Sequence, residues 1–451
     1  MFSKVLIANR GEAAVRVIRA CRELGVRTVA VYSEADADCL HVRLADEAIC
    51  IGPAATGRSY LHVPHIVQAA LMTGAEAVHP GTGFLSESAA FAEICIGYGL
   101  TFIGPLPETI WQLGDKARAR TVMRDAGLPV MPGSDAPVRS LDDAKELAGA
   151  LGYPVMLKAV GGGGGKGIRR LQSALDLVAA FPVAQAEAAS AFGNPDIYLE
   201  KCVEEARHIE VQILGDSHGA IVHLGERDCS LQRRAQKVVE EAPATGIPEA
   251  VRARLCEAAV TGARAVGYVN AGTWEFLVDR DDNFHFMEAN ARLQVEHPVT
   301  EAITGLDMVR MQLEIASGGH LPWTQDEIRL RGHSIECRIT ADDPQRNFAP
   351  GAGVVTRFDM PGGPGVRVDT HVVAGYEVPP YYDSLLAKLI TSGADREEAR
   401  ARMLRALAEF RIEGIATTVP FHMRLLSDPA FIAQALTTTF VERWLPGEVR
   451  P

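Results

Sequence analysis

The first hundred residues alternate between short apolar runs and one amphipathic stretch. Apolar runs at 5–8 and 28–32 predict two buried parallel strands, and the stretch at 11–24 predicts a helix that stops at Gly25. The apolar stripe of this helix is formed by Ala14, Val17, Ile18 and Cys21. No Gly-x-Gly-x-x-Gly follows the first strand, so the pattern predicts a Rossmann-like βαβ unit without the dinucleotide fingerprint.

Two alternating stretches, at 272–279 and 284–290, predict a β-hairpin. Residues 280–283 have the composition of a turn. That loop would pair residue 279 with 284, 277 with 286 and 275 with 288. Glu275 is therefore expected to face Glu288. If the second strand is regularly extended, one face carries Phe284, Phe286, Glu288, Asn290 and Arg292.

Two facing carboxylates on a half-buried sheet repel each other, and a divalent cation would remove that repulsion. Oxygen ligands from Glu275, Glu288 and Asn290 suit Mg²⁺ or Mn²⁺, and Arg292 could hold another anion beside the metal. The alternative interpretation is an exposed acidic hairpin in which the arginine forms salt bridges.

A strand-like run at 153–158 ends in Lys158 and is followed by five consecutive glycines, 161–165, and Lys166. So many glycines cost backbone entropy, which indicates close approach of main-chain N–H groups to a ligand, or movement. The run lacks the Walker A pattern, since Val160 and Gly167 stand at its defining positions. A mobile lid over phosphates is the preferred interpretation, and a passive linker is the alternative.

Other segments carry weaker signals. Asp115 is a candidate helix cap, and Lys116 in the first turn would favour a bound anion. The glycine-rich stretch 79–87 fits either a simple strand-to-helix connection or a functional loop, and the dense charge of 227–241 would suit a solvated surface loop. In the strand-like stretch 333–339, one face carries Ile335, Cys337 and Ile339 and the other carries Glu336 and Arg338.

Composition narrows the class of protein. The chain has 451 residues, which is too long for a single hydrophobic core and indicates about two to four subdomains. Its composition, 47% hydrophobic and 23% charged, is typical of a soluble globular protein. The net charge of −12 and the absence of a basic stripe argue against nucleic acid and anionic membranes as partners. Eight cysteines without Cys-x-x-Cys spacing argue against zinc sites and disulfide frameworks. With no signal-peptide pattern at the N-terminus, we expect a cytoplasmic protein.

From Lys4 to about Trp444 the chain closely resembles biotin carboxylase, the ATP-grasp component of biotin-dependent carboxylases. The motifs that carry the resemblance lie at 7–12, 79–87, 161–167, 226–234, 292–301 and 379–383. The resemblance implies a mixed α/β and α+β fold in three parts. These are a Rossmann-like domain at 1–114, an ATP-grasp domain at 115–330 with a lid at about 131–203, and a C-terminal domain at 331–451.

The resemblance also implies the reaction: a ligase that uses ATP, bicarbonate and Mg²⁺ or Mn²⁺ to carboxylate biotin on a carrier protein through carboxyphosphate. No Met-Lys-Met biotinylation site occurs in the chain, so the carrier and the carboxyltransferase are expected on separate chains. The final carboxyl acceptor stays open. Arg16, Arg19 and Glu23 match a dimerisation helix, which implies a homodimer, although Pro364 stands where an interface aromatic is often found.

Site roles follow from the resemblance, residue by residue. The residues that match ATP contacts are Lys116, Lys158, Gly163, Gly164, Gly165, Lys166, Glu200, Lys201, Val203, His208, Gln232, Glu275, Leu277 and Glu288. The residues that match metal ligands are Glu275, Glu288 and Asn290. The bicarbonate pocket is matched by Lys237, Arg292, Gln294 and Val295, with Glu296 as general base. On the biotin side the matches are Arg338, which would stabilise the biotin enolate, Thr82 and Asp383.

The chain departs from the family at several points. Thr82 replaces the usual tyrosine and Ala235 the usual histidine, which could loosen contacts with biotin and with nucleotide respectively. The segment 288–292 reads Glu-Ala-Asn-Ala-Arg, another departure. Two rival functions differ in class: an ATP-grasp ligase for another carboxylate, which would lack the 292–301 run, and a nucleotide-binding regulatory protein without catalytic activity. The second rival would show no ATPase activity with free biotin.

Overall fold

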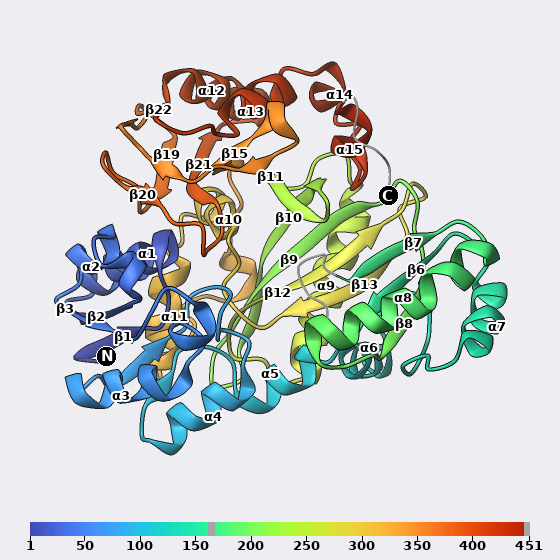
Figure 1. Ribbon diagram of the computed structural model, residues 1–451, viewed down its shortest axis with the longest axis horizontal. Helices are drawn as coiled ribbons and strands as arrows, with labels where there is room; N and C mark the ends of the chain where they lie inside the picture. Colours follow the sequence, from blue (N-terminus) through green and yellow to red (C-terminus); the bar gives the residue numbers. More distant parts are fainter. Residues whose placement is uncertain (161–166, 446–451) are drawn as a thin grey trace.

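A computed structural model describes residues 1–160 and 167–445 (Figure 1). The N-terminal unit is built on a parallel five-stranded sheet in the order β3-β2-β1-β4-β5. Its strands are β1 (Lys4–Ile7), β2 (Arg27–Tyr32), β3 (Glu47–Cys50), β4 (Ala77–His79) and β5 (Thr101–Phe102). Its longer helices are α1 (Gly11–Glu23), α3 (Val63–Thr73), α4 (Ala89–Gly97) and α5 (Pro107–Gly114). The predicted βαβ opening is confirmed, and the predicted apolar stripe of α1 is buried.

An antiparallel eight-stranded sheet, in the order β13-β12-β9-β10-β11-β14-β21-β19, runs through the middle of the molecule (Figure 1). Its strands are β9 (Arg207–Gly215), β10 (Ile221–Arg233), β11 (Gln236–Ala242), β12 (Asn270–Val278), β13 (Phe284–Asn290), β14 (His333–Thr340), β19 (Val366–Thr370) and β21 (Leu385–Gly393). Because β11 pairs with β14, the sheet continues from the middle of the chain into its C-terminal part.

Helices flank this sheet. They are α6 (Lys116–Asp125), α9 (Glu249–Ala265), α10 (His297–Thr304), α11 (Met308–Ala316), α12 (Arg396–Glu409) and α13 (Val419–Leu426). A separate three-stranded sheet, β7-β6-β8, is covered by two helices. It consists of β6 (Val155–Ala159), β7 (Ile168–Leu171) and β8 (Ile197–Lys201), with α7 (Leu141–Leu151) and α8 (Ala174–Phe192). The glycine run lies outside the described residues.

The β12–β13 hairpin has the predicted pairing at its functional end but not near its turn. Glu275 lies opposite Glu288 as predicted, whereas Phe276 pairs with Phe286 because a β-bulge leaves Met287 without a partner on β12. The bulge reverses the alternation of side chains. The core face therefore carries Phe284, Phe286, Ala289 and Ala291. The prediction that the two phenylalanines share a face with Glu288 and Asn290 is wrong.

The charged segment 227–241 is a β-hairpin and not a solvated loop. It forms most of β10 and β11, and Arg227 within it is fully buried. By contrast, the alternation predicted for 333–339 is confirmed, since Ile335, Cys337 and Ile339 all lie in one core cluster. A charged segment can enter the interior only if each charge finds a partner there.

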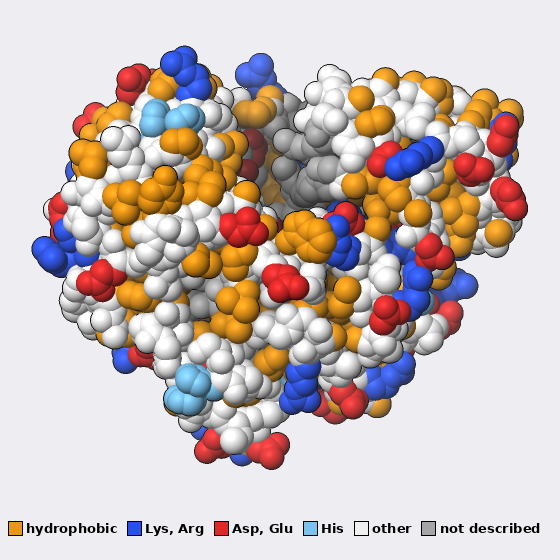
Figure 2. Space-filling model, turned by 90° about the horizontal axis from the view of Figure 1, so that it is seen from below, with side chains coloured by type: hydrophobic (Ala, Val, Ile, Leu, Met, Phe, Trp, Pro, Cys, Tyr) orange, Lys and Arg blue, Asp and Glu red, His pale blue; other side chains and the backbone are white. Residues whose placement is uncertain are grey.

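Surface features agree with the composition. Figure 2 shows one face of the molecule, on which acidic and basic side chains are interspersed among hydrophobic ones and a deep recess opens. All eight cysteines are free thiols. Within residues 1–160 and 167–445, no helix is long and apolar enough to cross a membrane.

Candidate active site

Lys237, on β11, lies at the centre of a buried cluster of carboxylates. Its Nζ donates to Glu210 Oε2 at 2.5 Å, to Glu296 Oε1 at 2.6 Å and to Glu275 Oε1 at 3.1 Å. Burial alone would lower the pKa of Lys237, but the three carboxylates outweigh it and raise that pKa well above its ordinary value. The lysine is therefore a fixed positive charge where three segments of the chain meet.

Glu296, in the segment before α10, is shared by two cations. Its Oε1 accepts from Lys237, and its Oε2 accepts from a terminal nitrogen of Arg338 at 3.0 Å. Burial alone would raise the pKa of Glu296, but Lys237 and Arg338 hold that pKa well below its usual range. The Nε of Arg338 donates to Glu240 at 2.6 Å. Glu296 is thus an ionised carboxylate, able to accept a proton, between groups from β11 and β14.

Arg292 connects this cluster to the glycine-rich loop 79–87. Its Nε donates to Glu87 Oε2 at 2.7 Å, and its terminal nitrogens donate to Gln294 at 2.9 Å, Asn290 at 3.1 Å and Thr82 at 3.3 Å. Two side chains of loop 79–87 therefore hold the guanidinium.

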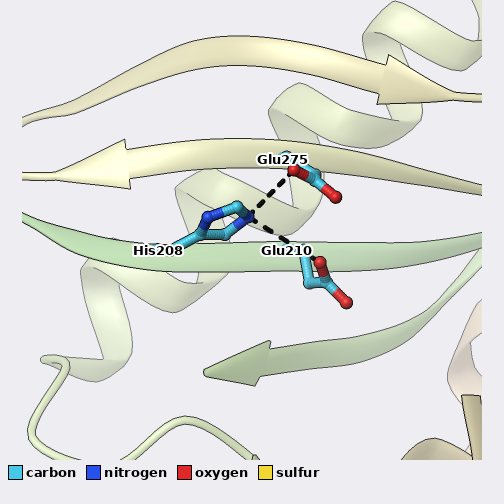
Figure 3. Close-up of side chains that lie close together, drawn as sticks. All are labelled: His208, Glu210 and Glu275. Atoms are coloured by element: carbon cyan, nitrogen blue, oxygen red, sulfur yellow. Dashed lines mark ion pairs between the residues drawn. The ribbon is translucent and has the colours of Figure 1, made fainter. Parts of the chain in front are cut away.

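Glu275 and its neighbours form a second part of the cluster (Figure 3). Gln232 donates to Nδ1 of His208 at 2.9 Å, which leaves the imidazole proton on Nε2. That Nε2 lies 2.9 Å from Glu275 and 3.8 Å from Glu210 (Figure 3). Glu275 also accepts from Asn290 at 2.8 Å and from Gln294 at 3.1 Å. These protein donors compensate the charge of Glu275. From the sequence, only a metal ion was expected to do so.

Two further ion pairs lie toward the three-stranded sheet. Lys116 Nζ is 3.2 Å from Glu288, and Asp115 caps α6 through the amides of Ala117 and Arg118, which confirms the predicted cap. Lys158 Nζ, on β6, is 2.5 Å from Glu200, on β8, whose other oxygen accepts from Arg120 at 3.1 Å. Lys116 and Lys158, which sequence reasoning linked to phosphate, therefore each have a carboxylate as partner.

The residues predicted to bind a metal fit that task by their chemistry. Glu275 and Glu288 face each other across the hairpin and Asn290 lies beside Glu275, so the donor set is two carboxylates and an amide oxygen. Hard oxygen donors of this kind suit Mg²⁺ or Mn²⁺ when phosphate oxygens complete the coordination. A second group, His208, Glu210 and Glu275, has ligand atoms within 4.8 Å of one another, but Lys237 already contacts both of its carboxylates.

Several predicted site residues lie apart from this network. Lys201 donates to the carbonyl oxygen of Gly152 at 2.8 Å, and Asp383 is exposed and caps the amide of Leu385. Val203 and Leu277 are partly buried, and Leu277 pairs with His208 across the strands. The backbone oxygen of Val295 accepts from Lys388 at 3.0 Å. Gly163, Gly164, Gly165 and Lys166 lie outside the described residues.

Sequence reasoning missed several residues that hold the site together. Arg227 donates to Glu210 at 2.6 Å and to Gln212 at 2.7 Å, and Lys388 is buried between Glu12 and Val295. Glu210 and Gln212 alternate with apolar residues along β9, on the face that carries the predicted His208. That alternation in a strand-like stretch was a usable signal. The contacts of Lys388 join distant segments and leave no local signature.

The fold and the site together define an ATP-grasp ligase. Three family models match the chain: "Biotin carboxylase, N-terminal domain" at 1–110, "Carbamoyl-phosphate synthase L chain, ATP binding domain" at 115–324, and "Biotin carboxylase C-terminal domain" at 336–443. Biotin carboxylase 1 of Bacillus subtilis is 52% identical over 445 residues, 98% of this chain and 99% of the relative. The biotin carboxylase of Allochromatium vinosum is 53% identical over 449 residues, covering 99% of each chain.

Solved structures agree. The Campylobacter jejuni biotin carboxylase complex with β,γ-ATP superposes with a TM-score of 0.96 at 47% identity, covering 98% of this chain and 99% of that one. The biotin carboxylase domain dimer of Hydrogenobacter thermophilus 2-oxoglutarate carboxylase, solved with MgADP, ADP and bicarbonate, gives 0.96 at 48% identity, covering 98% of each chain. The chain belongs to the biotin carboxylase family, ligases that use ATP and bicarbonate to carboxylate biotin in the first half-reaction of biotin-dependent carboxylases.

Proposed function

We propose that this chain carboxylates biotin on a carrier protein, with Glu296 as general base and Arg338 as the group that stabilises the biotin enolate. One observation carries the proposal: Glu296 accepts from Lys237 at 2.6 Å and from Arg338 at 3.0 Å. Glu296 thereby contacts both Lys237, assigned to bicarbonate, and Arg338, assigned to biotin.

In the first step, a bicarbonate oxygen attacks the γ-phosphorus of ATP, the bond to ADP breaks, and the bicarbonate proton passes to Glu296. Lys237 and Arg292 would hold the bicarbonate, since both are fixed by carboxylates and present positive charge to the same cluster. Placing a weak nucleophile against phosphate in this way lowers the entropic part of the barrier.

ATP would lie between the central sheet and the three-stranded sheet, with Lys116 and Lys158 at its phosphates. In the structure these lysines pair with Glu288 and Glu200, and a bound triphosphate would offer them a stronger anion. A divalent ion held by Glu275, Glu288 and Asn290 would neutralise phosphate charge. The glycine run would cover the nucleotide and exclude water from carboxyphosphate.

In the second step, carboxyphosphate breaks into CO₂ and phosphate, the ureido nitrogen of biotin gives its proton to that phosphate, and the nitrogen then attacks CO₂. The guanidinium of Arg338 would stabilise the negative charge on the ureido oxygen.

We further propose domain limits at 1–114, 115–330 and 331–451, with a lid at about 131–203. We also propose a cytoplasmic location, a homodimer, and a carrier and a carboxyltransferase on separate chains. Support for separate chains comes from relatives of similar length, such as Biotin carboxylase 1 of Bacillus subtilis, of which the alignment covers 99%.

The test is Glu296→Gln, which keeps the shape of the side chain and removes its proton-accepting charge. We expect both ATP cleavage and carboxybiotin formation to fall by about two orders of magnitude or more, the scale of losing a general base. Glu377→Gln, at an exposed position on β20 (Glu377–Val378), is the matched control and should retain both activities. Wild-type rates in the folded Glu296→Gln protein would refute the assignment.

A further inference from the structure

Two glutamates behind Arg338 have no role in the reaction described above. Glu240 on β11 and Glu336 on β14 are directly opposite each other in the antiparallel pairing. Directly opposite side chains project from the same face of a sheet and are close neighbours. Both side chains have zero solvent exposure. Two carboxylates in this arrangement cannot both be ionised without a large electrostatic cost.

The partners of the two glutamates are unequal. Glu240 Oε1 accepts from Nε of Arg338 at 2.6 Å, while Glu240 Oε2 and both oxygens of Glu336 have no hydrogen-bond partner among the described residues. A buried ionised carboxylate without a donor is strongly unfavourable, whereas a protonated one is tolerated. The contacts therefore favour a charge on Glu240 and a proton on Glu336.

The charges around the pair lead to the same assignment. The charged groups that act on it are Lys237 from β11, Arg338 from β14, Lys388 from β21 and Glu296 from the segment before α10. Two buried thiols, Cys229 from β10 and Cys337 from β14, are neutral there, because burial raises the pKa of each well above its ordinary value. Lys388 is already paired with Glu12 at 3.0 Å. Burial, and next the facing Glu240, raise the pKa of Glu336 well above its usual range. Burial raises the pKa of Glu240 to about 7 against the opposing charge of Arg338.

We propose that Glu240 and Glu336 form a positioning pair that holds one proton, so that a single negative charge lies behind Arg338. Arg338 then stands between two singly charged partners, Glu240 and Glu296. A second negative charge on the pair would draw the guanidinium toward the pair and away from Glu296, and a neutral pair would leave Glu296 as its only charged partner. The pair acts through Arg338 and contacts no substrate. The inference rests on the proposed role of Arg338 in biotin carboxylation.

Glutamine imitates a protonated glutamate, so the two positions should respond differently to the same change. Glu336→Gln should keep the turnover number for carboxybiotin formation within about twofold, because it replaces one neutral group by another. Glu240→Gln removes the charge and should lower that turnover number about tenfold or more, since Arg338 loses its position. The activity of the wild-type protein should fall on acidification through pH 7, as Glu240 gains a proton, and Glu240→Gln should lose this limb.

An infrared measurement reads the proton directly. The wild-type protein at neutral pH should have the carbonyl stretching band of a protonated carboxyl group, Glu336→Gln should lose part of that band, and Glu377→Gln should retain it. A tenfold loss of turnover in folded Glu336→Gln, or an unchanged turnover number and pH profile in Glu240→Gln, would overturn the proposal. So would a wild-type spectrum without the band, which requires no variant to fold. The infrared band does not depend on enzymatic activity. If the wild-type protein shows the band but makes no carboxybiotin, the proposed function is wrong and the shared proton is not.

Discussion

Replacing Arg338 by glutamine should separate the two halves of the reaction. The guanidinium makes two charge-assisted hydrogen bonds, to Glu240 at 2.6 Å and to Glu296 at 3.0 Å. Losing a donor that stabilises charge in a transition state costs about 2.7–4 kcal/mol, or about 10²–10³ in rate. Carboxybiotin formation should therefore fall by at least about 10²-fold.

Bicarbonate-dependent ATP cleavage should fall much less in Arg338→Gln. Glu296 keeps Lys237 at 2.6 Å, and this cation still favours the ionised base. Because one of its two cations is gone, the pKa of Glu296 should rise toward its ordinary value. We expect a decrease of less than about tenfold in ATP cleavage at neutral pH, where the carboxylate stays ionised.

The informative assay measures released phosphate and carboxybiotin in the same reaction. Their ratio should rise by about tenfold or more in Arg338→Gln, from the difference between the two losses. Arg411→Gln, an exposed arginine in the C-terminal part of the chain, is the matched control and should leave the ratio unchanged. If both products decrease equally in folded Arg338→Gln, the division of labour between Glu296 and Arg338 is wrong.

Three further predictions concern other parts of the molecule. Glu288→Gln should abolish Mg²⁺-dependent ATP turnover with an unchanged circular dichroism spectrum, and normal turnover would exclude Glu288 as a metal ligand. Thr82→Tyr should lower the KM for free biotin, and an unchanged KM would exclude residue 82 as a biotin contact. Burial alone would raise the pKa of Glu241, but His333 and Arg396 lower it to about 2, so its stabilisation is present above about pH 4.5 and is lost as pH falls toward 2. Glu241→Gln should reduce the free energy of unfolding at neutral pH by about 3 kcal/mol, and that free energy should then depend less on pH in the acid range. Chemical denaturation at several pH values measures this. If the free energies of unfolding of the wild-type and variant proteins decrease equally with acidification, the prediction is wrong.

The part of the site predicted best from sequence is local in the chain. Glu275 and Glu288 lie on one hairpin and face each other as predicted. The predicted register is one residue off near the turn, and the bulge offsets that error at Glu275. The bulge at Met287 was missed because the prediction assumed regular extension. A change of phase was visible in the sequence, since the apolar positions move from 284 and 286 to 289 and 291. Reading that change would have given the correct core face.

The part that sequence could not predict depends on contacts between distant segments. Arg227 is buried because Glu210, Gln212, Thr273 and Thr300 all accept from its guanidinium. Those partners belong to three other segments of the chain, so local charge density alone favoured a solvated loop. A buried arginine is stable only with such partners, and no periodicity reports them.

The pairing of β11 with β14 brings the groups proposed for the two chemical steps onto one carboxylate. Lys237 on β11 and Arg338 on β14 both contact Glu296, and the register of the two strands fixes the spacing between them. Lys388 on β21 adds a second link, since it contacts Glu12 from the N-terminal unit and the carbonyl of Val295. An unstable intermediate must reach its acceptor before water does, and a hydrogen-bonded sheet holds two reacting centres at constant distance better than loops can. For this reason the groups assigned to bicarbonate and biotin are expected to stay aligned throughout the two steps.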